Sequence, residues 1–216
     1  MLDKYQCLEK LAARRSDEIV VSTMSVATPW AELSDGPLDF ASVESAMGHA
    51  ADFACGLAMA QPTRRVIVLN GDGSTLMCLG TLVTIAQVAP PNLTIVITEN
   101  GTYEVTGNQR VPGADQVDYE LLCRGAGLHQ VQTVADVASF DAALDAHFAG
   151  SGPRVFIWRI AASDEPVPMP ALPIAERAQR LRRWSVLLSV VGLLASLLVV
   201  IAAGFLQEDG FALRQI

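Results

Sequence analysis

The sequence is poor in basic residues, and a third of them lie near its end. In residues 1–175, 10 lysines and arginines stand against 20 aspartates and glutamates. Proteins that bind nucleic acid place clustered Lys and Arg against phosphates. The acidic first part of the chain is therefore not expected to bind nucleic acid.

Cysteine is scarce as well. The four cysteines, Cys7, Cys55, Cys78 and Cys123, lie far apart and form no C-x-x-C pair. Zinc sites and small disulfide frameworks are typically marked by closely spaced cysteines. We therefore expect reduced cysteines that pack in a cytosolic domain, and no zinc.

One stretch lacks charge altogether. Residues 184–206 carry no charged side chain, and about 20 apolar residues suffice for a helix to cross a membrane. Four arginines lie in the segment before it, 176–183, which the positive-inside bias places in the cytoplasm. We expect a single-pass membrane protein with a cytoplasmic N-terminal domain; the alternative is a buried helix in an oligomer core. The charged N-terminus does not resemble a signal peptide.

Short β-branched runs alternate with segments of helical spacing over the first 160 residues. This alternation predicts a three-layer α/β/α domain with a mostly parallel sheet. The predicted strands are 18–23, 65–70, 93–98, 128–133 and 154–160, and the predicted helices lie near 46–60, 75–88, 115–126 and 136–149.

The composition changes after Ile160, where four prolines fall within residues 166–173. Proline fixes the backbone dihedral φ and favours extended geometry, so this segment predicts a semi-rigid spacer. The predicted organisation is a domain over 1–160, a Pro-rich and then basic linker over 161–183, a transmembrane helix over 184–206 and a short tail over 207–216.

The strand at 65–70 ends in the corner Gly71-Asp72-Gly73. Glycines allow close backbone approach, and Ser74 and Thr75 stand where the free N–H groups of the next helix point outward. Such a corner suits a diphosphate. The Asp72 carboxylate supplies the hard oxygen that Mg²⁺ prefers.

The next strand, 93–98, ends in a second polar corner that contains Asn100. Because parallel strands end at one edge of a sheet, its amide oxygen is expected near Asp72. A magnesium ion could take oxygens from Asp72, from Asn100, from a main-chain carbonyl and from a diphosphate. The alternative is two independent turns.

Gly71-Asp72-Gly73, followed after 25 intervening residues by Glu99-Asn100, resembles the cofactor motif of thiamine diphosphate enzymes, with Glu99 in place of the first Asn. The resemblance implies Mg²⁺ ligands from the Asp72 and Asn100 side chains and from the Thr102 main-chain carbonyl. Longer stretches within 1–160 resemble phosphonopyruvate decarboxylases and the sulfopyruvate decarboxylase β subunit.

The segment Ser45-Ala46-Met47-Gly48-His49 resembles the last part of that family's G-S-M-G-H-A pattern and departs from it at Ser45 and Ala46. The resemblance implies that Met47 bends the cofactor and that the Ser45 carbonyl accepts from the aminopyrimidine. His49 is the catalytic candidate, through a substrate carboxylate or proton transfer. The alternative is a helix-start histidine bonded to nearby backbone.

Glu104 and Gln109 follow the second corner and are candidates for lining the substrate pocket. A solvated loop acid is the commoner role for such a glutamate.

The family's activating Glu belongs to a separate pyrimidine-binding domain, for which residues 1–40 are too few. The resemblance therefore implies a thiamine diphosphate- and Mg²⁺-binding subunit of a 2-oxo acid decarboxylase, inactive alone and completed by a pyrimidine-binding partner in a hetero-oligomer. The alternative is a membrane-tethered cofactor-binding or regulatory protein of the same fold without turnover.

Overall fold

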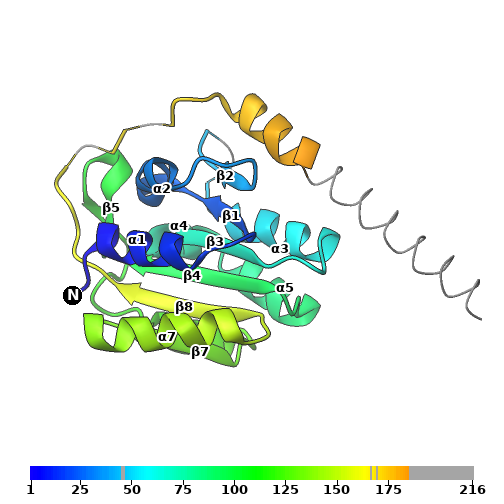
Figure 1. Cartoon of the computed structure of the whole chain (residues 1–216). Helices are drawn as coiled ribbons and strands as arrows, with labels where there is room; N and C mark the ends of the chain where they lie inside the picture. The colour runs from blue at the N-terminus through cyan, green and yellow to red at the C-terminus, as the bar shows by residue number, and fades with distance from the viewer. Residues whose placement is uncertain (45–46, 166, 169, 185–216) are drawn as a thin grey trace, which may run out of the picture.

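The computed structural model describes residues 1–44, 47–165, 167–168 and 170–184 (Figure 1). In chain order, the elements are α1 (Lys4–Arg14), β1 (Ile19–Ser22), η1 (Met24–Val26), α2 (Ala27–Leu33), β2 (Asp39–Ala41), α3 (Ala50–Ala60), β3 (Val66–Gly71), α4 (Asp72–Met77), α5 (Gly80–Val88), β4 (Leu93–Glu99), β5 (Thr102–Tyr103), η2 (Glu104–Thr106), β6 (Gln109–Arg110), α6 (Tyr119–Gly125), β7 (Gln130–Val134), α7 (Val137–Ala149) and β8 (Arg154–Arg159). Residues 174–184 are also helical.

The main sheet has the strand order β2-β1-β3-β4-β8-β7, and neighbouring strands pair in parallel throughout. Helices cover both faces of this sheet, and α1 and α7 lie in front of it in Figure 1. The predicted three-layer α/β/α arrangement with a parallel sheet is therefore confirmed. A small antiparallel pair, β5 with β6, stands apart from the main sheet.

Successive residues of each central strand enter two different cores. In β3, Val66 and Val68 pack into the core that contains α3 and α5, while Ile67 and Leu69 pack into the core that contains α1 and α7. Parallel strands buried on both faces read as continuous apolar runs. This is why the central strands were visible in the sequence.

Several elements were not predicted. Helix α1 is capped by Asp3, whose side chain accepts from the Gln6 N–H, and it buries Leu8 and Leu11 against the sheet. The short elements α2, β2 and β5 were missed as well, because two to seven residues carry too little periodicity. The helix expected over 75–88 is divided into α4 and α5, with Cys78 in a non-helical conformation between them.

The chain folds back over the β2 edge after β8. The helical residues 174–184 lie beside β2 in Figure 1. Leu181 is 4% exposed and belongs to the same apolar core as Phe40 of β2. Arg177 and Leu181 are four residues apart and so share one helix face. Part of the expected linker is thus packed on the domain.

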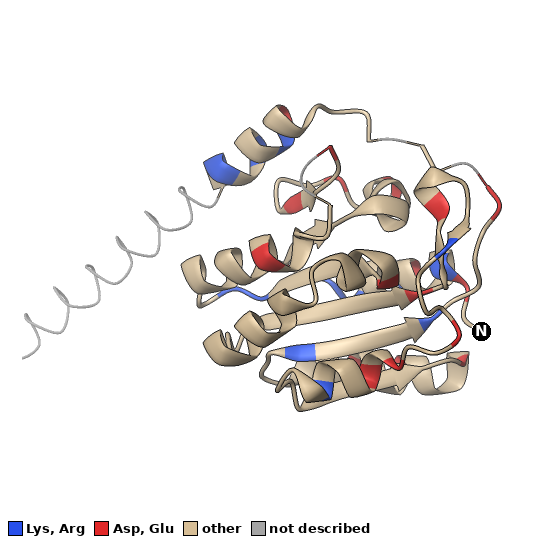
Figure 2. Cartoon of the chain, turned by 180° about the vertical axis from the view of Figure 1, so that it is seen from behind, with Lys and Arg blue, Asp and Glu red and all other residues tan. Residues whose placement is uncertain are grey.

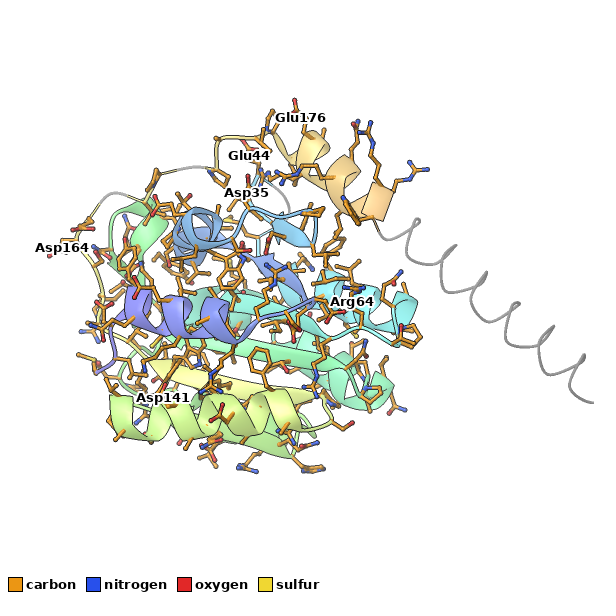
Figure 3. The ribbon with its side chains drawn as sticks, viewed as in Figure 1. Asp35, Glu44, Arg64, Asp141, Asp164 and Glu176 are labelled. Carbon is orange, nitrogen blue, oxygen red and sulfur yellow. The ribbon has the colours of Figure 1, made fainter. Side chains whose placement is uncertain are left out.

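Ion pairs hold the same helix in place. The Arg177 guanidinium donates to the Ala41 carbonyl and pairs with Glu44 at 3.0 Å, and Arg180 pairs with Asp35 at 3.0 Å. Figure 3 shows Glu44 and Asp35 beside this helix, and Figure 2 shows its basic residues gathered near its end. Arg177 and Arg180, two of the four arginines in 176–183, therefore contact acids of their own chain.

The membrane part of the predicted fold class is corrected here. Among the described residues no helix is long and apolar enough to cross a membrane. The predicted span 184–206 and the tail 207–216 lie outside the described residues, apart from Trp184. The span was inferred from an uncharged run, a pattern that helices packed on protein share. The transmembrane helix, and the membrane location with it, are withdrawn.

Candidate cofactor site

A cavity of about 250 Å³ opens at the carboxyl ends of β1, β3 and β4. In the sheet, β2 lies on one side of β1 and β3 lies on its other side, so the strand order reverses at β1. Ligands typically bind at such switch points of parallel sheets. The residues that line this cavity include Met24, Ser25, Met47, Gly48, Gly71, Asp72, Gly73, Ser74, Met77, Thr98, Asn100, Thr102, Tyr103 and Glu104.

Asp72 begins α4 directly after β3 and joins the two predicted corners. Its Oδ1 accepts from the Gly73 N–H at 2.7 Å, and its Oδ2 accepts from the N–H groups of Asn100 at 3.1 Å and Gly101 at 2.7 Å. The residue is only 3% exposed. Burial raises the pKa of the Asp72 carboxyl above its usual range, and the three backbone donors oppose that rise. The corners are not independent turns.

Asn100 and Thr102 continue the second corner. The Asn100 Oδ1 accepts from the Thr102 N–H at 2.9 Å, across Gly101, whose φ of +73° suits glycine. The Thr102 hydroxyl donates to Asn108 Oδ1 at 3.1 Å. Asp72, Asn100 and Thr102 thus lie together at one side of the cavity.

The first turn of α4 combines a tight contact with an unpaired hydroxyl. A Cβ atom at Gly73 would lie 2.3 Å from Tyr103 Cε1, so the ring leaves room for glycine alone. The buried Ser74 Oγ has no hydrogen-bond partner among the described residues. Thr75 instead uses its hydroxyl within the fold, where it donates to the Gly71 carbonyl at 2.8 Å.

The loop before α3 forms another part of the cavity wall. Met47 lines the cavity and is 59% exposed, and Gly48 follows it with a φ of +85°. The predicted residue Ser45 lies outside the described residues.

His49 immediately precedes α3, and it is not one of the described residues that line the cavity. Its Nδ1 lies 2.6 Å from Asp52 Oδ2, and its Nε2 lies 3.4 Å from Cys78 Sγ. The imidazole makes no capping hydrogen bond to the helix backbone. Cys78 and Asp52 were not among the predicted site residues. The three-residue spacing of His49 and Asp52 is a detectable helix signal, but the approach of Cys78 depends on the break between α4 and α5.

Glu104 lines the cavity from η2 and is fully engaged. Its Oε2 lies 2.7 Å from Lys4 Nζ, and its Oε1 accepts from the Ser163 N–H at 2.9 Å. Burial acts to raise the pKa of Glu104, but the Lys4 ammonium and the Ser163 N–H outweigh it and hold the pKa below its usual range. The Glu104 side chain is 0% exposed, so it is not the solvated loop acid considered above. Gln109 is exposed on β6.

Comparison with known proteins identifies the family. Residues 22–157 match the family described as "Thiamine pyrophosphate enzyme, C-terminal TPP binding domain". Sulfopyruvate decarboxylase subunit beta of Methanothermobacter thermautotrophicus is 38% identical over 147 residues, which are 67% of this chain and 76% of that one.

Phosphonopyruvate decarboxylase of Streptomyces viridochromogenes is 33% identical over 184 residues, or 84% of this chain. This chain spans 46% of that enzyme's length. Among solved structures, benzoylformate decarboxylase from Polynucleobacter necessarius superposes with a TM-score of 0.66 at 19% identity, over 76% of this chain and 34% of that one. The last similarity shows the fold alone.

These matches confirm the predicted cofactor, because the family description itself names thiamine pyrophosphate, and Mg²⁺ is typical of the family. They also confirm the predicted enzyme class at the level of the family, since the relatives are named decarboxylases. The chain therefore belongs to the thiamine pyrophosphate enzymes and contains their C-terminal TPP binding domain.

Proposed function

We propose that this chain is the diphosphate- and Mg²⁺-binding subunit of a thiamine diphosphate-dependent 2-oxo acid decarboxylase, with a small substrate of the sulfopyruvate or phosphonopyruvate type. A separate pyrimidine-binding subunit completes its active site. The match to relatives named subunit beta supports a hetero-oligomer. The buried Asp72 carboxylate, which joins the ends of β3 and β4, is the observation that carries the proposal.

The residues at this corner fit a divalent cation. A carboxylate has about four acceptor positions, and Asp72 uses three of them for backbone N–H groups. One acceptor position remains, and Asp72 lines the cavity together with Asn100 and Thr102. Asp72 and Asn100 would bind Mg²⁺ through side-chain oxygens and Thr102 through its main-chain carbonyl.

The start of α4 fits a diphosphate. Apart from its two chain neighbours, no described residue has an atom within 4 Å of the position that a Cβ at Gly71 would take, so a ligand can approach the backbone there. The Ser74 hydroxyl is buried, lines the cavity and lacks a partner among the described residues. Buried polar groups are rarely left unpaired. Gly71, Gly73 and Ser74 would contact the diphosphate, and Thr75 would hold the turn.

The other end of the cofactor lies toward Met47 and Ser45 in this proposal. Bound thiamine diphosphate supplies the electron sink for decarboxylation of a 2-oxo acid. Two carboxylates line the described cavity, and both have assigned contacts: Asp72 faces the metal corner and Glu104 is paired with Lys4. This supports a partner chain as the source of the activating glutamate.

The apolar rim of the cavity also supports a partner. Met47 is 59% exposed and Met77 is 46% exposed, and both line the cavity. Exposed apolar side chains that adjoin a site are typical of protein interfaces. His49, which immediately precedes α3, would act on the substrate carboxylate or in proton transfer.

Calorimetry with thiamine diphosphate and Mg²⁺, on the chain assembled with its co-purified partner, tests the metal assignment. Asp72→Asn keeps the size of the side chain and an acceptor oxygen, whereas alanine would leave three backbone donors unpaired. We expect affinity to fall at least about 100-fold, because groups that only support a metal ligand already change affinity by about 10–100-fold.

Asp141→Asn on α7 is the matched control, because Asp141 pairs with Lys10 at the surface and lies away from the cavity lining. Unchanged cofactor affinity in Asp72→Asn, with the fold intact, would remove Asp72 from the proposed metal site.

A further inference from the structure

A thiol, an imidazole and a carboxylate meet beside the cofactor cavity. The Cys78 Sγ lies 3.4 Å from His49 Nε2, and His49 Nδ1 lies 2.6 Å from Asp52 Oδ2. The Thr81 hydroxyl donates to the other Asp52 oxygen. Each nitrogen of the His49 ring therefore has its own partner, and the carboxylate is itself held in place.

This order of groups is suited to activation of a nucleophile. A carboxylate at Nδ1 favours the tautomer in which Nδ1 carries the proton and Nε2 is free to accept. The Nε2 atom of His49 can then accept the proton of the Cys78 thiol. Thiolate, rather than thiol, is the nucleophilic form of cysteine, and an adjacent base is the usual way to activate such a group.

We propose that Cys78 is a reactive thiol and a site of covalent modification by soft electrophiles and by peroxide, with His49 as its base and Asp52 as the orienting carboxylate. With hydrogen peroxide, the thiolate sulfur attacks one oxygen, and an S–O bond forms as the O–O bond breaks. The departing hydroxide takes the proton from the His49 imidazolium and leaves as water. Sulfur is oxidised by two electrons to a sulfenic acid, and the peroxide is reduced.

The other three cysteines differ from Cys78 in their surroundings. Cys7, Cys55 and Cys123 are buried, whereas Cys78 is partly exposed. Burial raises the pKa of the Cys7 and Cys123 thiols to about 12. One native chain thus contains one accessible thiol beside a base and three sheltered thiols for comparison.

Modification of Cys78 has a consequence for the cavity. A Cβ atom at Gly48 would lie 2.8 Å from Cys78 Sγ and 2.9 Å from Met77 Cβ, so the sulfur packs directly on the loop that contains Met47. Gly48 and Met47 both line the cavity. We expect a group added to the sulfur to displace this loop and thereby to weaken cofactor binding. This consequence rests on the proposed function, whereas the reactivity of the thiol does not.

The test uses the full chain, purified without a partner and treated with limiting iodoacetamide at pH 7. Alkylation forms an S–C bond and releases iodide, and peptide mass spectrometry gives the rate at each cysteine. We expect Cys78 to react first, and His49→Gln to slow it about tenfold through loss of the base. Asp52→Asn should slow it less. Dimedone should trap a sulfenic acid at Cys78 after peroxide treatment of the wild-type chain.

His129→Gln is the matched control, because it makes the same change at an exposed histidine of another segment. Equal Cys78 rates in the wild type and in folded His49→Gln would overturn the proposal, as would equal slowing by His129→Gln. Circular dichroism verifies the fold of each variant. If His49→Gln does not fold, the Cys78 alkylation rate of Asp52→Asn is compared with that of the wild type instead, and equal rates would then overturn the proposal. These rates are informative even for a chain that binds no thiamine diphosphate.

Discussion

At the scale of single residues, two acids of one cavity have different surroundings. Among the described residues, only backbone N–H groups donate to the Asp72 carboxylate, and Asp72 lines the cavity. Glu104 is neutralised by a buried lysine from α1. A carboxylate that is paired with an ammonium group has its charge compensated within the protein. A carboxylate that is held only by backbone N–H dipoles keeps its charge and can still attract a cation.

The Lys4–Glu104 pair is expected to position the loop that follows β5. Lys4→Met leaves the Glu104 carboxylate buried without its counter-ion and should cost about 3–5 kcal/mol of unfolding free energy. Lys4→Met combined with Glu104→Gln removes both charges and should recover most of that loss. Cofactor affinity should stay about tenfold weaker in the double variant, as for other supporting groups. Urea unfolding and calorimetry measure the two effects.

Lys10→Met is the control for Lys4, because it removes another α1 lysine whose partner, Asp141, is partly exposed. Full recovery of both stability and cofactor affinity in the double variant would show that the pair has no positioning role.

His147 makes stability depend on pH. Burial, and next the nearby Arg154, lower the pKa of His147 to about 4 from 6.5. Between these values the unfolded chain binds a proton that the folded chain does not, so stability falls as pH drops from 6.5 to 4. The loss is at most about 3 kcal/mol. Urea unfolding at pH 7 and near pH 4 measures it.

His147→Phe cannot titrate and retains an aromatic ring against Phe156, on which His147 stacks at 4.4 Å. The pH-dependent loss should therefore be smaller in this variant. Equal losses in both proteins would assign the effect to other groups.

At the scale of elements, the helical residues 174–184 act as a cover for the β2 edge. Leu181 is 4% exposed in the same core as Phe40, and Arg177 closes the contact through Ala41 and Glu44. Truncation of the chain near residue 175 therefore removes packed contacts of the domain as well as the spacer.

Leu181→Ala should destabilise the domain by about 2–4 kcal/mol, because truncation of a buried leucine loses its burial and leaves a cavity. Leu121→Ala on α6 is the control, since Leu121 is 66% exposed and should change stability by less than about 0.5 kcal/mol. Urea unfolding measures both variants. A Leu181→Ala value as small as the control's would contradict the docking of this helix.

At the scale of the whole molecule, the site is proposed to be complete only in an assembly. The purified chain should bind thiamine diphosphate weakly and release no CO₂ from sulfopyruvate or phosphonopyruvate, because the activating carboxylate is proposed to come from the partner. Addition of a pyrimidine-binding subunit should restore both properties together, and general acid–base help alone is worth about 10²–10⁴-fold in rate. Decarboxylation by the chain alone at an ordinary enzymatic rate would refute the half-site proposal.

The sequence by itself determined the layers and the sheet edge at which the candidate site residues lie. Strands buried on both faces are continuous apolar runs, and the helices between them have their own period, so both are local patterns. Parallel strands end at one edge, which brought the corners at Asp72 and Asn100 together without knowledge of any contact.

Only the tertiary structure decided which side chains meet across long separations. Lys4 and Glu104 are 100 residues apart, and Cys78 meets His49 because α4 ends where a longer helix was expected. The helical residues 174–184 dock through Arg177, Arg180 and Leu181, and the basic composition of the segment hides this signal. Such contacts depend on the relative placement of elements, and local periodicity carries no information about that placement.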